Sequence, residues 1–351
     1  MERRQAEGSP RDRLLQGLPV QGKPLDVNGI ATLVLAGGQG PPLVLLHGGI
    51  ECGGAYWAPV IPRLGQCHRL IIPDVPGLGE SEPVGRLDAD AFDNWFAALL
   101  RLTCDEKPTL VAHSLLGSMA ARFGARHSDL LHRLVIYAAP GIGPYRMPLG
   151  LRVVALRFAL RPSESNAERF DRRAFFDFDR ARQMDPEWFE AFSDYTRSRA
   201  VVSHVKRTMR QLVGSCTKQV PDAELRRIGV QAALLWGRHD RFVPVGLAQS
   251  ASTRLGWPLH VIDDAGHVPH IEQPQAFLDA LAAAQSSGDG RVASLRMGWR
   301  PCGGSVHPKG AVTMCKPGGC GPWCCRAGPR PCGATYRCLS HTCSVSPLRP
   351  G

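Results

Sequence analysis

Short, continuously apolar segments recur along the chain, and longer segments between them carry apolar residues at a helical spacing. A strand that is covered on both faces of a sheet has no polar face, so the short runs predict buried strands. These runs are 43–46, 70–72, 109–112, 134–137, 233–236 and 259–262. The helix-length segments are 88–102, 115–126, 245–255 and 274–284. The alternation predicts an α/β fold with a mostly parallel sheet and helices on both faces.

An N-terminal hairpin precedes the first buried run. Residues 25–36 contain two β-rich pieces on either side of Asn28-Gly29. This dipeptide favours the positive φ angles of a two-residue turn, so the segment predicts two antiparallel strands.

The alternation stops between residues 141 and 222, where only helical patterns occur. The expected helices are 149–160, 163–184 and 186–212. Ten of the 24 aromatic residues of the chain fall in this region. The pattern predicts a helical insertion over the C-terminal edge of the sheet. Its aromatic rings would then face a ligand or form the insertion's own core.

The two ends of the chain differ from the rest in composition. Residues 1–17 are polar and lack the apolar run of a secretory signal. In residues 286–351, Gly, Pro and Cys account for 28 of 66 residues. Such a segment buries too little apolar surface to offset its ordering entropy, so both ends are expected to be disordered. The predicted organisation is a core of 18–140 and 223–285, an insertion at 141–222, and disordered ends at 1–17 and 286–351.

The net charge of +11 belongs mainly to the tail. Residues 286–351 hold nine Lys or Arg and one acidic residue, whereas residues 17–285 carry a net charge of only +2. A nearly neutral core does not favour nucleic acid as a partner. No run of about 18 uncharged apolar residues occurs, so no membrane span is expected.

The cysteines divide in the same way, with four in residues 1–285 and eight in the tail. Few, scattered cysteines in the core predict a reducing compartment, which indicates the cytoplasm. The tail spacings Cys320-x3-Cys324 and Cys338-x4-Cys343 lack the C-x-x-C pair that is typical of zinc sites. We therefore expect neither a metal nor an organic cofactor.

Ser114 lies where a predicted strand meets a predicted helix. The segment Ala112-His113-Ser114-Leu115-Leu116-Gly117 follows the run 109–112 and opens the helix 115–126. A serine on such a sharp turn presents its hydroxyl above the sheet edge, and the turn requires small neighbours. Taken alone, a serine at such a position is more often a helix N-cap than a nucleophile.

A glycine pair and two polar residues follow other predicted strands. His47-Gly48-Gly49 ends the run 43–46, and the N–H groups of Gly49 and Leu115 would face a developing oxyanion. Asp240 and His267 follow the last two strands. A carboxylate there can orient a histidine, and the histidine can deprotonate Ser114 and then protonate a leaving group. The chain order Ser, Asp, His is the order expected for this architecture.

Together these segments resemble the alpha/beta-hydrolase superfamily from about residue 20 to residue 284. The matching segments are His47-Gly48-Gly49, residues 74–81, the turn at Ser114, residues 236–240, and Gly266-His267 followed by Glu272-Gln273-Pro274. The resemblance implies the α/β-hydrolase fold, a helical cap at 141–222 and a structural role for the loop 74–81. The sequence departs from the family at Leu116, where the family usually has glycine.

Several residues compete for the roles of acid and base. Asp263 or Asp264 could replace Asp240, but their position three or four residues before His267 favours a turn-capping role. His270 could replace His267, although the resemblance favours His267.

Other residues near the predicted site are given different roles. His113 is interpreted as a packing residue. Cys52 lacks a histidine placed for a cysteine mechanism. Asp74 could be mistaken for the nucleophile of family members that use aspartate, but Ser114 holds the turn position.

The expected function is that of a serine hydrolase that cleaves a small apolar or aromatic carboxylic ester through an acyl-enzyme. One alternative is carbon–carbon bond hydrolysis of aromatic-degradation intermediates, and several arginines of the insertion could reach a substrate carboxylate. Another is a catalytically weak protein that binds a small ligand. The arginines in question are Arg146, Arg152, Arg157 and Arg161.

Overall fold

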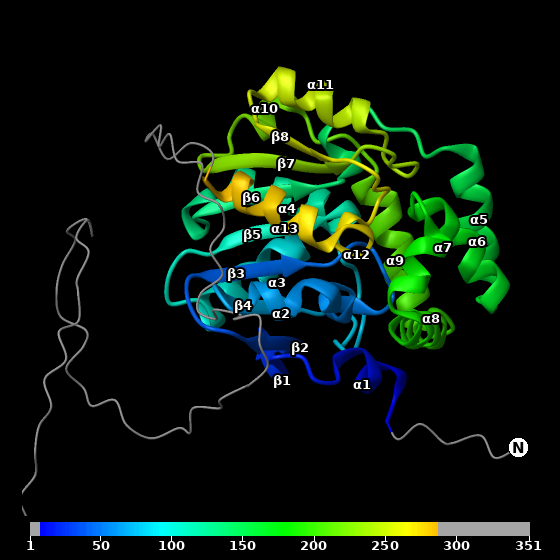
Figure 1. Cartoon of the computed structure of the whole chain (residues 1–351). Helices are drawn as coiled ribbons and strands as arrows, with labels where there is room; N and C mark the ends of the chain where they lie inside the picture. Colours follow the sequence, from blue (N-terminus) through cyan, green and yellow to red (C-terminus); the bar gives the residue numbers. More distant parts are fainter. Residues whose placement is uncertain (1–7, 287–351) are drawn as a thin grey trace, which may run out of the picture. The chain divides into compact units, whose positions relative to one another are not determined.

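A computed structural model describes residues 8–286, in which eight strands form one sheet (Figure 1). The order is β1-β2-β4-β3-β5-β6-β7-β8, and every neighbouring pair from β4 to β8 is parallel. The strands are β1 (Val20–Val27), β2 (Ile30–Gly37), β3 (Pro42–Leu46), β4 (Arg69–Pro73), β5 (Thr109–His113), β6 (Arg133–Tyr137), β7 (Gln231–Gly237) and β8 (Leu259–Ile262). The predicted fold class is confirmed.

The expected hairpin is formed by β1 and β2. Val27 pairs with Ile30, which leaves Asn28 and Gly29 as the two turn residues. Their φ angles are 54° and 77°, the left-handed region that Asn and Gly tolerate. The hairpin joins the sheet because β2 pairs antiparallel with β4.

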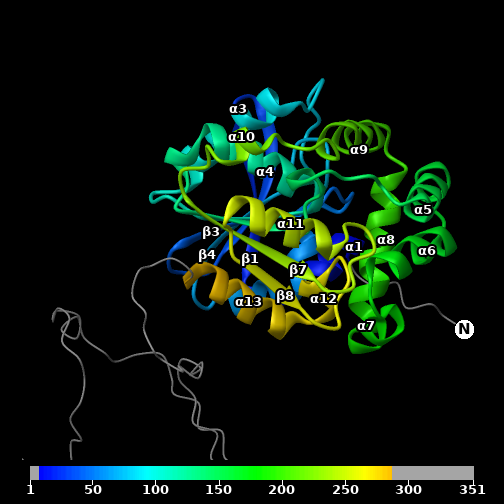
Figure 2. The same ribbon diagram turned by 90° about the horizontal axis from the view of Figure 1, so that it is seen from above.

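Helices cover both faces of the sheet, with α3 and α4 on one face and α13 on the other (Figure 2). The Asp88 side chain accepts a hydrogen bond from the Ala91 N–H and so caps α3. The long helices are α3 (Ala89–Thr103), α4 (Ser114–Arg126), α11 (Val245–Leu255) and α13 (Pro274–Ser286). The short ones are α2 (Ile61–Leu64), α10 (Asp222–Leu225), α12 (Pro269–Glu272), η1 (Gly53–Val60), η2 (Ser128–Leu130) and η3 (Pro140–Ile142).

Five helices occupy the chain between η3 and α10. Two helices expected to be continuous are each broken, one at residues 175–177 and the other at 201–202. The first break has a clear cause, because the Ala174 carbonyl accepts the His267 N–H and the Phe176 N–H donates to Glu272, in place of bonds that would continue the helix. The helices are α5 (Leu149–Leu160), α6 (Glu164–Ala174), α7 (Phe178–Met184), α8 (Pro186–Ala200) and α9 (Ser203–Cys216).

Disorder was expected for residues 1–17, and this does not hold for α1 (Pro10–Leu15). Ser9 and Asp12 form a capping box at its start. The Arg11 guanidinium is buried and lies 3.1 Å from a carboxylate oxygen of Asp74. It also donates to the hydroxyl of Tyr195 on α8 at 2.9 Å. A charged partner far away in the sequence orders this segment, and the local pattern does not reveal that partner.

The predictions made for the cysteine-rich tail, disorder and the lack of a metal site, concern residues 287–351, which lie outside the described residues. Within 8–286, the four cysteines are free, no cluster of three metal-ligating side chains occurs, and no helix has the length and apolarity needed to cross a membrane.

Candidate active site

Ser114 begins α4 directly after β5, and its backbone adopts a φ of 52°. A positive φ is unfavourable for a residue with a side chain and is found where the surrounding structure imposes it. Two glycines make room for the turn. A Cβ on Gly48 would lie 2.7 Å from His113 Nδ1, and one on Gly117 would lie 2.9 Å from the carbonyl oxygen of Ala112.

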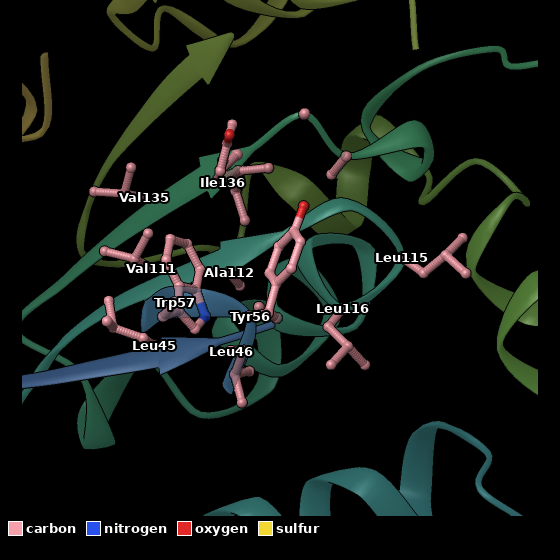
Figure 3. Packing of buried hydrophobic residues seen from close by; sticks show 14 of the residues in the cluster. Leu45, Leu46, Tyr56, Trp57, Val111, Ala112, Leu115, Leu116, Val135 and Ile136 are labelled. Carbon is pink, nitrogen blue, oxygen red and sulfur yellow. The ribbon is translucent and has the colours of Figure 1, made fainter. Parts of the chain in front are cut away.

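Leu116, the departure from the family pattern, is completely buried. Figure 3 shows it among core side chains of β3 and β5, with Leu115 pointing in a different direction. The position that must be small is therefore Gly117, where a Cβ would also lie 2.8 Å from the Ala139 Cβ. The bulky residue fills the core beneath the turn.

The hydroxyl of Ser114 lies 2.9 Å from Nε2 of His267, and Nδ1 of His267 lies 2.8 Å from a carboxylate oxygen of Asp240. Because a carboxylate only accepts, Nδ1 carries the proton and Nε2 is free to accept the hydroxyl proton of Ser114. The other oxygen of Asp240 accepts the N–H groups of Phe242 and Val243 at 2.8 and 2.9 Å. The sequence placed these three residues after β5, β7 and β8, and the structure brings them together.

Gly49 and Leu115, the residues of the predicted oxyanion donors, are neighbours, because the Leu115 side chain lies against Gly49. A Cβ on Gly49 would lie 2.4 Å from Cδ1 of Leu115. Within the part of the chain that the structure describes, neither backbone N–H donates a hydrogen bond. The Leu115 N–H belongs to the first turn of α4, whose amides have no partner in the helix. Both groups therefore remain candidates for the predicted oxyanion donors.

His47 holds the glycine loop in place. Its Nε2 accepts the Val75 N–H at 3.1 Å, so its Nδ1–H donates to the carbonyl of Gly48 at 2.5 Å. Burial lowers the pKa of His47, which keeps the ring neutral as this arrangement requires.

The competing residues are placed elsewhere. Asp263 is paired with Arg238 at an exposed position, and Asp264 is exposed in a turn with a φ of 49°. His270 is buried 3.0 Å from the hydroxyl of Tyr137, and burial lowers its pKa to about 3. None of these side chains contacts Ser114.

Cys52 and Asp74 are completely buried. Burial raises the pKa of the Cys52 thiol, which disfavours the thiolate. Asp74 accepts the N–H groups of Gly54 and Glu80 at 2.6 and 2.8 Å, and it pairs with Arg11. The Asp74 carboxylate therefore joins three segments.

Sequence reasoning missed how the backbone of His267 is held. His113, interpreted as a packing residue, lies with Nε2 3.0 Å from the His267 carbonyl oxygen. The His267 N–H donates to the carbonyl of Ala174 at 2.6 Å. The carbonyl group of His267 is thus held by the end of β5, and its N–H group is held by the end of α6.

Glu272 joins the same loop to the insertion. One carboxylate oxygen accepts the Gly266 N–H at 2.7 Å, and the other accepts the Phe176 N–H at 2.6 Å. Burial raises the pKa of Glu272 to about 6. Glu272 was noted as part of a motif, but no local signal pointed to residues 174–176 as its partners.

Two further carboxyl groups, Glu51 and Asp171, interact electrostatically near the glycine loop. Both are half-buried, Glu51 two residues after Gly49 and Asp171 on α6. Burial raises the pKa of Glu51 to about 7 and that of Asp171 to about 8. The surroundings of the site therefore disfavour additional negative charge.

Most of the aromatic residues in the insertion pack on one another. Phe175, Phe178 and Phe189 are buried with ring centroids 5.6–5.9 Å apart. Phe192 approaches Tyr56 at 6.3 Å. A second series runs to the base, because Phe170 contacts Phe242 and Phe242 lies 4.8 Å from the His267 ring.

Comparison with known proteins adds the family context. The model of the alpha/beta hydrolase family matches residues 43–280. The 2-hydroxy-6-oxo-2,4-heptadienoate hydrolase of Pseudomonas putida is 28% identical over 279 residues, which cover 75% of this chain and 96% of that protein. The pimeloyl acyl-carrier protein methyl ester esterase of Aeromonas hydrophila is 26% identical and is covered to 95%, with 70% of this chain aligned.

Solved structures agree on the fold. The carboxylesterase CesB of Bacillus subtilis matches with a TM-score of 0.69 at 20% sequence identity, covering 80% of this chain and 96% of its own. Similarity at this level of identity establishes the fold alone.

Proposed function

The chain belongs to the alpha/beta hydrolase family, and from that premise we propose that it is a serine hydrolase that cleaves a carboxylic ester through an acyl-enzyme. The contact of 2.9 Å between Ser114 Oγ and His267 Nε2 is the observation that carries the proposal. A nucleophile, a base and an acid that orients the base are the parts that acyl transfer requires.

In the first half of the proposed reaction, His267 Nε2 accepts the proton of Ser114 while Oγ forms a bond to the ester carbonyl carbon. The carbonyl oxygen gains the negative charge and accepts hydrogen bonds from the Gly49 and Leu115 amides. Asp240 stabilises the imidazolium that forms. The intermediate collapses, the carbon–oxygen bond to the alcohol breaks, and His267 gives its proton to the alkoxide.

In the second half, His267 accepts a proton from water while the water oxygen attacks the acyl carbon. Collapse of the second intermediate returns the proton to Ser114 and releases the carboxylic acid. Each oxyanion donor contributes about 3–4 kcal/mol to the transition state in comparable sites. The proposed residues accomplish both halves without a cofactor.

An uncharged apolar ester fits the burial near the site better than an anionic substrate does. The burial that raises the pKa values of Glu51 and Asp171 also disfavours a substrate carboxylate. Four insertion arginines were considered as carboxylate partners, and all four side chains are exposed on or beside α5. These are Arg146, Arg152, Arg157 and Arg161.

Carbon–carbon bond hydrolysis remains the second candidate, favoured by the 28% identity to the Pseudomonas putida heptadienoate hydrolase. The products separate the two reactions. An ester yields an acid and an alcohol, whereas a dienoate ketone yields an acid and a shorter dienoate. The ester proposal predicts higher kcat/KM for short p-nitrophenyl esters than for any dienoate in the same panel.

The test of the serine mechanism combines a fluorophosphonate probe with a p-nitrophenyl ester assay. Ser114→Ala should abolish labelling and lower kcat by at least about 10³-fold, because the nucleophile is lost. Ser250→Ala, an exposed serine on α11, is the matched control and should retain both. Labelling that persists in Ser114→Ala would refute the assignment. Tight ligand binding without labelling or turnover would support the weakly catalytic ligand-binding class.

A further inference from the structure

Helix α5 presents an apolar stripe to solvent. Leu149, Val153, Leu156 and Leu160 are exposed by 74%, 40%, 60% and 74%. Their spacing of four, three and four residues places them on one face of the helix. The inward face is also apolar, with Leu151 and Phe158 buried. The exposed stripe is therefore additional to the side that α5 packs against the insertion.

Arginines surround the stripe. At about 100° per residue, Arg152 and Arg157 lie on opposite sides of it, and Arg146 and Arg161 lie near the two ends of α5. All four side chains are exposed, and none has an ion-pair partner in residues 8–286. From residue 143 to residue 163 the chain contains these four arginines and no Asp or Glu.

The helices α6 and α7 do not neutralise this surface. Glu168 of α6 and Asp179 of α7 are each 2.7 Å from the guanidinium of Arg172, so those carboxylates are already paired. From residue 143 to residue 174 the chain holds seven arginines against three acidic residues, one of which is the exposed Glu164. The side chain of Arg173 lies against Gly150, where an added Cβ would come within 2.5 Å of it. The charge around α5 is thus positive.

An apolar stripe flanked by arginines suits contact with an anionic lipid surface. Leucines enter the acyl boundary of a bilayer, while arginine stems follow the apolar surface and their guanidinium groups reach anionic headgroups. We propose that α5 docks this protein on an anionic lipid surface. A helix of 12 residues, about 18 Å long, lies in the plane of such a surface.

The docking face connects to the candidate active site through packed rings. Phe158 on the inner side of α5 stacks on Phe170 at 6.0 Å, Phe170 contacts Phe242 at 5.1 Å, and Phe242 contacts His267. A bound lipid surface would therefore lie at the end of the molecule that holds Ser114. The docking proposal does not depend on the proposed ester hydrolysis, because lipid binding can be measured without turnover.

The test is cosedimentation of the full chain with vesicles of phosphatidylcholine alone or mixed with phosphatidylglycerol. Binding is measured at about 0.1 M and about 1 M salt, where the screening lengths are about 10 Å and about 3 Å. The high salt concentration weakens electrostatic attraction, so the binding that remains there reports the apolar contact. The second condition also suppresses attraction by the basic residues 286–351. The wild-type chain should bind the mixed vesicles best and retain weaker binding at high salt.

Two double variants remove the apolar and the charged contributions to lipid binding separately. Leu156→Ser with Leu160→Ser should weaken binding at least about tenfold at high salt, because two buried leucines are lost from the lipid. Arg152→Glu with Arg157→Glu should weaken it at low salt. The matched controls on α3 are Leu102→Ser and Arg101→Glu, both exposed, and they should bind like the wild type. Unchanged melting temperatures establish that each variant is folded.

Three results would overturn the proposal. The wild-type chain could fail to bind the mixed vesicles, or the α5 variants could bind as tightly as the wild type. The third is a dimer, detected by sedimentation velocity without lipid and abolished by Leu156→Ser with Leu160→Ser, in a chain that does not bind vesicles. That result would assign the stripe to a second copy of the chain.

Discussion

At the scale of single residues, the candidate site depends on a strained serine and on neighbours that impose the strain. Ser114 holds a φ of 52° because β5 ends in the core and α4 must begin at once. Gly48 and Gly117 leave the space that this turn needs. Backbone strain of this kind is typical of positions where a side chain must project toward a reacting group.

Leu116→Gly tests whether the departure from the family pattern strains this turn. Leu116 is buried, so its removal should lower the free energy of unfolding by about 3–5 kcal/mol through a cavity and a helical glycine. We expect no gain in kcat toward p-nitrophenyl esters. Urea denaturation and steady-state kinetics of the purified variant measure the two quantities.

Leu116→Met is the conservative control and should lower the free energy of unfolding by less than about 1.5 kcal/mol. Gly117→Ala should lower kcat, because its Cβ would press on Ala112 and Ala139 beneath Ser114. A Leu116→Gly enzyme that turns over faster than the wild type would show that the leucine does strain the turn.

Glu272→Gln should change how stability depends on pH. Burial raises the pKa of Glu272 from 4.5 to about 6, so the folded state binds the proton more tightly than the unfolded chain. The stability present below about pH 4.5 is then lost as the pH rises through about 6, a change of about 2 kcal/mol. In Glu272→Gln this decrease of the free energy of unfolding with rising pH should be absent. Urea unfolding at about pH 4.5 and about pH 7 gives the comparison.

Glu187→Gln, at an exposed position on α8, should keep the wild-type slope. The side-chain amide introduced by Glu272→Gln offers one acceptor oxygen to the two N–H groups of Gly266 and Phe176, so we also expect a lower kcat at neutral pH. Equal slopes in the wild type and Glu272→Gln would contradict the assignment.

At the scale of elements, the loop of His267 is positioned by two segments that are distant in the sequence. The carboxyl end of α6 bonds to it through Ala174 and, by way of Glu272, through Phe176. The end of β5 bonds to it through His113. The insertion therefore helps to hold the base, besides lying over the strands' carboxyl ends.

A second connection between elements is made by α1, and Arg11→Met tests it. Arg11 is buried between Asp74 of the core and Tyr195 of α8. Removing one partner of a buried ion pair leaves Asp74 with an uncompensated charge, so we expect a loss of about 3 kcal/mol in the free energy of unfolding. Chemical denaturation at neutral pH provides the measurement.

Arg13→Met serves as the control on the same helix. The Arg13 side chain pairs with Asp194 at 3.0 Å, and both partners are partly exposed. Such pairs contribute about 1 kcal/mol or less. If Arg11→Met and Arg13→Met lower the free energy of unfolding by the same amount, the buried pair of Arg11 and Asp74 stabilises the fold no more than the exposed pair does.

At the scale of the whole molecule, the described residues contain a main hydrophobic core, to which α13 contributes, and a small separate cluster of Phe158, Ala167 and Ala200. Phe277 and Leu281 of this helix are buried, and the Ala284 carbonyl accepts a hydrogen bond from Arg133. On this face α13 lies against β6, β7 and β8 (Figure 2).

A chain shortened to end at Ser286 should therefore keep its melting temperature and its esterase rate. A chain that ends at Gln273 should fail to fold, because it lacks the apolar side chains of α13 that cover the sheet. Thermal melts and ester hydrolysis of both chains test this. Clear loss of stability in the longer one would assign a structural role to residues 287–351.

The sequence by itself determined the sheet, the hairpin and the three residues proposed for the reaction. Buried strands and two-residue turns are encoded by neighbouring residues, through periodicity and the φ preferences of Asn and Gly. Ser114, Asp240 and His267 each follow such a strand, and the carboxyl ends of parallel strands share one edge of a sheet. Their convergence is therefore readable without coordinates.

Only the tertiary structure decided how these residues are held and what the insertion presents to solvent. His113 and His267 are 154 residues apart, and Phe176 and Glu272 are 96 apart. The ordering of α1 and the break after Ala174 depend on such distant partners, and the α5 stripe is exposed because no described segment packs on it. An amphipathic pattern shows that a helix has an apolar face, but only packing determines whether that face is buried.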